Sequence, residues 1–223
     1  MIRLQLFGLA AFTAAVLLCS SSAHATGDKK NGRTLIYTCN GCHGIPGTNN
    51  AYPQYPVPKI AGQSEQYLID ALHAYKAGQR AHPTMTAQAQ SLSDQEIEDI
   101  AAYLSSLAPT PPKDTDAQAK KAKDLLTQSD AGKLASKCVA CHSNDGNGTA
   151  PQFPRLAGQY NEYIQHVVHE YQDGERDNPI MKPQVTNLSP DDIKQLADYF
   201  STLPTQLEKP DELSTLKGHV QGD

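Results

Sequence analysis

The 223-residue chain contains no tryptophan, only four phenylalanines and only three methionines, so large apolar side chains are scarce. The chain is long enough for one large or two small domains, and this composition would fill two cores of ordinary size thinly. A bound apolar group in each core would supply the missing volume. Positive charge is not in excess either, because 19 basic residues face 24 acidic ones. This balance argues against a surface that binds nucleic acid.

Long apolar runs are absent except at the N-terminus. Arg3 is followed by an apolar stretch from Leu4 to Leu18 and then by the small-residue site Ala23-His24-Ala25. This order is typical of a cleaved secretory signal peptide, and the apolar stretch is short for a membrane span. We therefore expect residues 1–25 to be removed and the mature protein to be soluble and located in the periplasm.

Four of the five cysteines belong to one motif that occurs twice. The pattern Cys-x-x-Cys-His is the attachment signature of c-type haem, in which both thiols add to the porphyrin and the next imidazole binds the iron as its proximal ligand. The chain thus predicts two covalently bound haem c groups and an electron-transfer function. The two copies are Cys39, Cys42 and His43, then Cys138, Cys141 and His142.

Other interpretations of these cysteines fit less well. A thioredoxin-like redox disulfide needs a strand and a helix around the pair, and the surrounding sequence has no strand pattern. A zinc site needs the two pairs to converge, although each pair already has its own adjacent histidine. The fifth cysteine, Cys19, allows lipoprotein processing as an alternative, but Leu18 before it is a poor fit to the small residue that such processing prefers.

The chain repeats itself at an offset of 96 residues. The segment Val57–Gln63 returns as Phe153–Gln159, with a proline, a basic residue and Ala-Gly-Gln at the same places. The haem motifs are offset by 99 residues instead, so the first copy contains three extra residues within the stretch from Asn49 to Val57. Two copies of this length indicate tandem domains rather than a solenoid.

The expected domain limits follow from this repeat. A Pro-rich polar stretch between the copies predicts a semi-rigid linker, and a polar end without periodicity predicts an extended tail. The limits are 1–25 for the signal peptide, 26–107 for the N-terminal domain, 108–118 for the linker, 119–204 for the C-terminal domain and 205–223 for the tail.

Each copy is expected to be helical. One helix leads into each haem motif, a middle helix has an apolar face, and a last helix begins at a serine, where Ser93 and Glu96 form a capping box. The predicted spans are 28–38, 64–77 and 93–107 in the first copy, then 129–137, 159–172 and 189–203 in the second.

Two methionines are candidates for the second axial ligand of the haem irons. Met85 and Met181 occupy equivalent positions, each two residues after a proline on an expected loop between the middle and last helices. A thioether opposite the imidazole raises the reduction potential compared with two imidazoles. Simple core filling explains two equivalent methionines poorly, since the mature chain has no others. The competing ligands are His73, His82, His166 and His169.

Other residues are expected to support the haems without binding iron. Each proximal imidazole needs a hydrogen-bond acceptor for its second ring nitrogen, and the carbonyls of Pro58 and Pro154 are the candidates. Arg80 and Arg176 are candidate partners of the haem propionates, although ordinary exposed arginines would fit the sequence equally well.

Taken together, these motifs resemble the dihaem cytochrome c4 family over nearly all of residues 27–205. The resemblance rests on the two haem motifs, the two Pro-x-x-Ala-Gly-Gln segments, the two methionines and the last helices that follow Leu-Ser. It implies an all-α fold of two class I cytochrome c domains related by a pseudo-twofold axis. Each domain would wrap around one covalent haem, with the propionate edges near the interface.

The resemblance also implies a function. Members of the family carry single electrons in the periplasm, often with loose membrane association, from a membrane-bound donor complex toward a terminal oxidase or other acceptors. Because both axial positions of each iron are filled, we expect no enzyme activity, and we expect a monomer.

Two alternatives keep the haems and change the function. A dihaem subunit of a periplasmic oxidoreductase, such as a flavocytochrome sulfide dehydrogenase, would co-purify with a catalytic subunit. A dihaem peroxidase would need one open iron, which the two equivalent methionines argue against.

Overall fold

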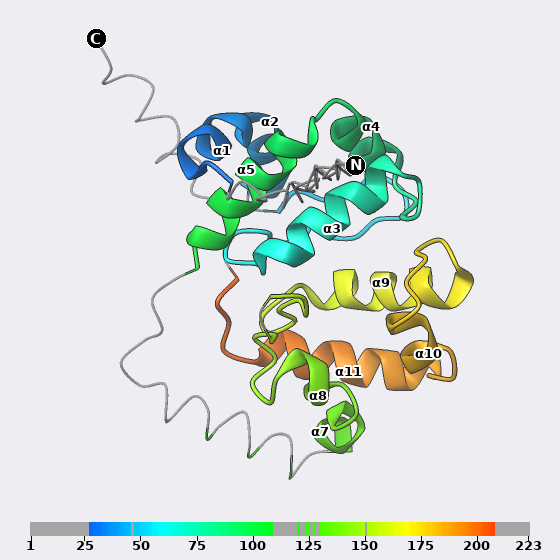
Figure 1. Cartoon of the computed structure of the whole chain (residues 1–223). Helices are drawn as coiled ribbons and strands as arrows, with labels where there is room; N and C mark the ends of the chain where they lie inside the picture. Colours follow the sequence, from blue (N-terminus) through cyan, green and yellow to red (C-terminus); the bar gives the residue numbers. More distant parts are fainter. Residues whose placement is uncertain are drawn as a thin grey trace, which may run out of the picture.

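The computed structural model in Figure 1 describes residues 27–45, 47–108, 120, 124, 127, 130–149 and 151–207. The expected signal peptide and most of the expected linker and tail lie outside these residues. Across the described ranges the chain forms helices and no strand beyond two isolated bridges, one of which pairs Arg80 with Arg176. None of the described helices combines the length and the apolar character that crossing a bilayer requires.

The helices form two bodies, as the repeat predicts (Figure 1). Helices α1 to α5 make one body and α7 to α11 make the other. The first contains α1 (Lys29–Leu35), α2 (Tyr37–His43), α3 (Glu65–Lys76), α4 (Pro83–Gln90) and α5 (Asp94–Ser106). The second contains α7 (Asp130–Ala135), α8 (Val139–His142), α9 (Asn161–Asp173), α10 (Met181–Val185) and α11 (Pro190–Thr202).

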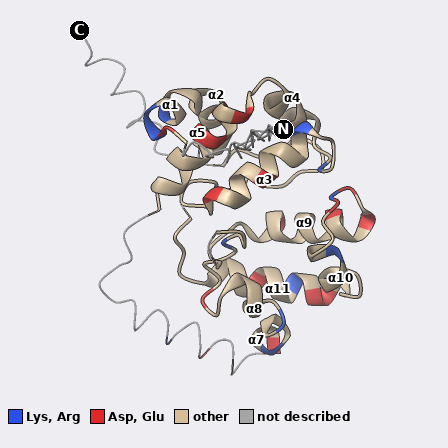
Figure 2. Ribbon diagram, in the orientation of Figure 1, with Lys and Arg blue, Asp and Glu red and all other residues tan. Residues whose placement is uncertain are grey.

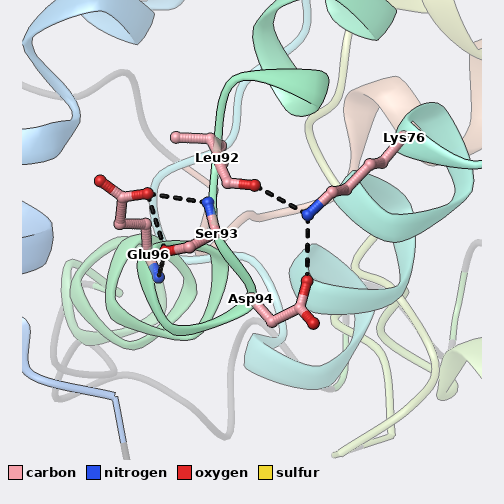
Figure 3. A network of polar contacts seen from close by, with 5 residues as sticks. All are labelled: Lys76, Leu92, Ser93, Asp94 and Glu96. Atoms are coloured by element: carbon pink, nitrogen blue, oxygen red, sulfur yellow. Dashed lines mark hydrogen bonds and ion pairs between the residues drawn. The ribbon is translucent and has the colours of Figure 1, made fainter.

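The start of α5 is fixed by local polar contacts (Figure 3). The Glu96 N–H donates to Ser93 Oγ at 3.3 Å, and the Ser93 N–H donates to the Glu96 carboxylate at 2.8 Å, which is the predicted capping box. At the end of α3, Lys76 Nζ donates to the Leu92 carbonyl at 2.8 Å and pairs with Asp94 at 3.1 Å. These contacts hold the end of α3 against the start of α5.

Each body has its own small apolar core. The predicted apolar stripes of the last helices are buried, and they pack on residues of the first and middle helices of the same body. The cores centre on Ile36, Leu68, Ile100, Ala101 and Leu104 in the first body, and on Ala135, Ile164, Leu196, Ala197 and Phe200 in the second.

The two bodies meet through contacts that occur in pairs, as a local twofold axis requires. The Ala81 N–H donates to the Glu175 carbonyl at 2.9 Å, and the Asp177 N–H donates to the Gln79 carbonyl at 2.8 Å. Both pairs are related by the same offset of 96 residues as the sequence repeat. Equivalent loops after α3 and α9 therefore lie against each other.

Two short helices replace the loops that the sequence predicts around the methionines. Met85 lies in the first turn of α4, and Met181 is the first residue of α10. The expectation of a loop was wrong because a polar side chain three residues before each methionine accepts from the methionine N–H. The His82 ring accepts from the Met85 N–H at 3.2 Å, and Asn178 Oδ1 accepts from the Met181 N–H at 2.9 Å.

A buried carboxylate joins α1 to α5 in the first body. Asp99 is 2% exposed and accepts from the Asp28 N–H at 2.7 Å, from Asn31 Nδ2 at 2.7 Å and from Gln95 Nε2 at 2.9 Å. The helices approach so closely that a Cβ on Gly32 would lie 2.0 Å from the Asp99 carbonyl oxygen. Burial alone would raise the pKa of Asp99, but the three hydrogen bonds outweigh it and hold this pKa below the ordinary 3.8.

Replacing Asp99 by alanine should destabilise the first body, because three donors lose a buried acceptor. The expected cost is about 1–3 kcal/mol in the free energy of unfolding, measured by urea titration of the holoprotein. The stability that Asp99 gives to the wild type should shrink as the pH falls from about 4 toward the lowered pKa of Asp99. Protonation of the carboxylate then removes the charge that its three hydrogen bonds stabilise. Gln195→Ala, the equivalent and exposed position of α11, is the control and should change little. Equal losses in both variants would contradict this account of Asp99.

Candidate haem sites

The two cysteine pairs lie on short helices, one in each body. Cys39 and Cys42 lie in α2. Cys138 is the residue directly before α8, and Cys141 lies in α8. None of the four forms a disulfide with another described residue. Burial raises the pKa of the Cys39 and Cys138 thiols. The described residues contain no strand beside either pair, whereas a redox-active pair of the thioredoxin type lies between a strand and a helix.

The described residues also give no support to a zinc site. They contain no group of three or more histidine, cysteine, aspartate or glutamate side chains placed to hold a metal ion. A zinc ion shared by the two cysteine pairs would require such a group.

The two histidines of the motifs are buried and oriented by the predicted prolines. His43 Nδ1 lies 2.8 Å from the Pro58 carbonyl oxygen, and His142 Nδ1 lies 2.9 Å from that of Pro154. A carbonyl only accepts, so each Nδ1 must carry the proton. The lone pair of each imidazole is therefore on Nε2, the nitrogen that can bind a metal.

The His142 ring fits a covalently attached haem directly. His142 is only 4% exposed, so water hardly reaches it, and yet its Nε2 has no hydrogen-bond partner. Burial lowers the pKa of His142, and the Pro154 carbonyl only partly opposes this, so the ring is held neutral. A neutral, orphaned nitrogen next to two thiols is what a haem iron requires on its proximal side.

His82, one of the competing ligands, has another role. Its Nδ1 accepts from the Met85 N–H, so its Nε2 carries the proton and donates to Asn50 Oδ1 at 3.2 Å. Nδ1 thus caps α4, and Nε2 is engaged by the side chain of Asn50. Asn178 lies at the equivalent position before α10 and accepts from the Met181 N–H, so a histidine in one copy and an asparagine in the other make the same contact. In the sequence, the feature that indicates a helix start here is His82 directly before Pro83, because proline is common at the first helical position.

The two arginines are buried at the boundary between the bodies, so the alternative of ordinary exposed arginines is wrong. Each is 5% exposed. Arg80 Nη2 donates to Tyr163 Oη at 2.9 Å, and Arg176 Nη2 donates to Tyr67 Oη at 3.0 Å, so each crosses to the other body. The Nε of Arg80 is buried and has no hydrogen-bond partner. This donor points to a missing acceptor near the boundary.

One carboxylate near these arginines breaks the twofold symmetry. Glu170 is buried, with Oε1 at 3.1 Å from His166 Nε2 and Oε2 at 4.0 Å from Arg176 Nη1. The equivalent residue in the first body is Ala74. Tyr55, from the stretch that holds the three extra residues, stacks on His166 with ring centroids 4.0 Å apart. The sequence did not indicate roles for Tyr55 or Glu170, because neither has an equivalent in the other copy.

Replacing Glu170 by alanine should destabilise the junction of the two bodies. Arg176 would then lose its buried carboxylate partner, and breaking a buried ion pair costs about 3–5 kcal/mol. Urea unfolding of the holoprotein, followed by far-UV circular dichroism, measures the loss. Glu175→Ala removes the same charge from an exposed position and is the control. If the control lost as much stability as Glu170→Ala, net charge and not the buried pair would be responsible.

Comparisons with known proteins agree with this geometry. A family model described as Cytochrome c matches residues 30–108 and 128–204. Cytochrome c4 of Azotobacter vinelandii is 35% identical over 198 residues, covering 81% of this chain and 91% of its own. A thiosulfate dehydrogenase electron acceptor of Thiomonas intermedia is 34% identical over 142 residues, covering 62% of this chain and 64% of its own.

A solved structure agrees as well. The crystal structure of reduced recombinant cytochrome c4 from Pseudomonas stutzeri aligns with a TM-score of 0.61 at 34% identity, covering 80% of this chain and 100% of that one. The chain therefore belongs to the cytochrome c4 family, and it is a dihaem electron-transfer cytochrome made of two tandem cytochrome c domains, with two haem c groups.

Proposed function

We propose that this cytochrome is exported to the periplasm, where it carries single electrons between redox proteins toward a terminal oxidase of a respiratory chain. The observation that carries the proposal is the neutral, buried His142 ring with an orphaned Nε2 beside two thiols. The repeat places His43 in a matching site with the same proline contact. Two such sites in one small chain suit a relay between partners.

The proposal assigns a role to each predicted site residue. Cys39, Cys42, Cys138 and Cys141 would hold the two haems covalently, and His43, His142, Met85 and Met181 would bind the irons. The haem would supply one-electron redox chemistry. With a histidine and a methionine on each iron, the metal would have no place for a substrate, and the protein would carry electrons without making or breaking other bonds.

The surroundings of the sites support this role. The proline carbonyls fix the orientation of the imidazoles, and apolar packing in each body keeps water away. Arg80, whose Nε lacks a partner, is proposed to donate to a haem propionate, and Arg176 is proposed to do the same in the other body.

Met85→Ala and Met181→Ala should each affect one haem. The altered haem should lose the thioether-to-iron charge-transfer band, fall in reduction potential and bind carbon monoxide in its ferrous form, which the wild type should not do. Absorption spectra and a redox titration measure these changes. Met85→His and Met181→His are matched controls: they should restore six-coordination but keep the lower potential. Unchanged spectra in both alanine variants would refute the ligand assignment.

The partner is the finer part of the proposal. Figure 2 shows acidic residues at the end of α9 and the start of α11, and basic residues around α1. The acidic positions are Asp173, Glu175, Asp177, Asp191 and Asp192. We expect a partner with a basic surface to dock on the second body, because opposite charges accelerate encounter.

A second candidate function is electron acceptance from a thiosulfate dehydrogenase. It is favoured by the similarity to a protein named thiosulfate dehydrogenase electron acceptor.

Stopped-flow mixing tests the direction of electron flow. Reduced protein should be oxidised rapidly by membranes that contain a cytochrome oxidase, and the rate should fall as ionic strength rises. Reduction by a thiosulfate dehydrogenase with thiosulfate is the matched assay for the second candidate. Failure to reduce the oxidase, together with rapid reduction by the dehydrogenase, would reverse the preference. Export predicts that the mature protein is recovered from the periplasm and begins at Thr26. The proposal also expects this protein to be a monomer.

A further inference from the structure

A single peptide group in the first body connects its proximal imidazole to the second body. The carbonyl of this peptide belongs to Pro58 and accepts from His43 Nδ1 at 2.8 Å. The N–H of the same peptide belongs to Lys59 and donates to Gln159 Oε1 at 3.1 Å. One planar amide thus has a hydrogen bond from the histidine at one end and a hydrogen bond to the other body at the opposite end.

The second body contains the mirror arrangement. The Pro154 carbonyl accepts from His142 Nδ1 at 2.9 Å. The N–H of the same peptide, that of Arg155, donates to Gln63 Oε1 at 2.8 Å. Gln63 belongs to the first body, so each glutamine reaches across the boundary to the peptide that holds the other body's histidine.

Both glutamine side chains are held rigidly. Each is 4% exposed. Gln159 Nε2 donates to the Lys59 carbonyl at 2.9 Å, and its Oε1 also accepts from the Tyr160 N–H at 3.0 Å. Exchanging the amide nitrogen and oxygen of Gln159 would place an NH₂ group against the Lys59 N–H and an oxygen against the Lys59 carbonyl. The contacts therefore fix Oε1 at the Lys59 N–H.

Gln63 is fixed by the same pattern. Its Nε2 donates to the Arg155 carbonyl at 3.1 Å, and its Oε1 also accepts from the Ser64 N–H at 2.8 Å. The two amides are therefore oriented alike by three hydrogen bonds each, two of which cross the boundary.

Hydrogen bonds at the two ends of one peptide strengthen each other. A peptide that donates through its N–H becomes more polarised, and its carbonyl then accepts more strongly. A stronger acceptor at Nδ1 makes the imidazole a better electron donor through Nε2. A better donor stabilises ferric iron relative to ferrous iron, which lowers the reduction potential.

We propose that Gln159 lowers the reduction potential of the haem held by His43, and that Gln63 does the same for the haem held by His142. Each glutamine is a positioning residue that acts on the haem of the opposite body through one peptide group. This inference rests on the proposed role of the two histidines as iron ligands. It makes the junction of the bodies part of both haem sites.

The test compares Gln159→Leu with Gln63→Leu in the full-length holoprotein. Gln159→Leu should raise the potential of the first haem and leave that of the second nearly unchanged, and Gln63→Leu should do the reverse. Spectroelectrochemical titration gives both potentials. Repeating each titration with Met85→Ala or Met181→Ala identifies which haem has moved, since each alanine marks one haem by its lost charge-transfer band.

A purely structural role for the glutamines predicts a different result. Loss of packing would shift the haem of the altered body, or both haems alike, and either outcome would overturn the proposal, as would two folded variants without any shift. Ser64→Ala is the control, because the Ser64 hydroxyl donates to the Pro151 carbonyl across the same boundary without touching either peptide. It should leave both potentials in place.

A second variant guards against misfolding of the leucine variants. Gln159→Glu, protonated at this buried position, keeps an oxygen that accepts from the Lys59 N–H and has a hydroxyl that donates to the Lys59 carbonyl, so the potential of the first haem should stay near the wild-type value. A rise like that expected for Gln159→Leu would contradict the proposal. If the alanine variants at Met85 and Met181 leave the spectra unchanged, the ligand assignment fails separately, and that result is read before the glutamine data.

Discussion

The hydrogen bond from a buried imidazole to a proline carbonyl is the constraint on which each half of this protein depends. It places the proton on Nδ1 of His43 and His142 and leaves Nε2 free of protons, so the ring presents its lone pair to the thiol side of the motif. Proline suits the acceptor position because its ring limits the backbone around that carbonyl. The rest of each body, with its capped last helix and small core, holds this pair together.

The same proline carbonyl belongs to a peptide that faces the other body, so the junction is not a passive contact. Buried polar groups must be satisfied, and here the two bodies satisfy each other's groups in pairs: glutamine with peptide, arginine with tyrosine. Separating the bodies would break these hydrogen bonds and leave water to replace them. The tandem arrangement is therefore expected to behave as one unit.

The sequence predicted whatever depends on neighbouring residues or on periodicity. The haem motifs, the capping box of Ser93 and Glu96 and the apolar helix faces are local patterns, and the repeat supplied a second copy of the haem motif and of the apolar faces. The sequence did not place Met85 on a helix, because a histidine in this position is equally a possible iron ligand and is a less common helix cap than serine or aspartate. It also missed Gln63, Gln159 and Glu170. Their roles depend on how two distant segments meet, and no local pattern encodes that meeting.

The twofold symmetry of the junction is incomplete, and the departures share one location. Glu170 replaces the alanine of the first copy, its neighbour His166 replaces Asp70, and Tyr55 stacks on that histidine. A duplicated chain with two identical sites would have no preferred direction for an electron between them. A buried carboxylate on one side of the boundary stabilises positive charge more strongly there than across it. The symmetric contacts thus join the two bodies, and the few asymmetric residues among them give the two sides of the boundary different electrostatic surroundings.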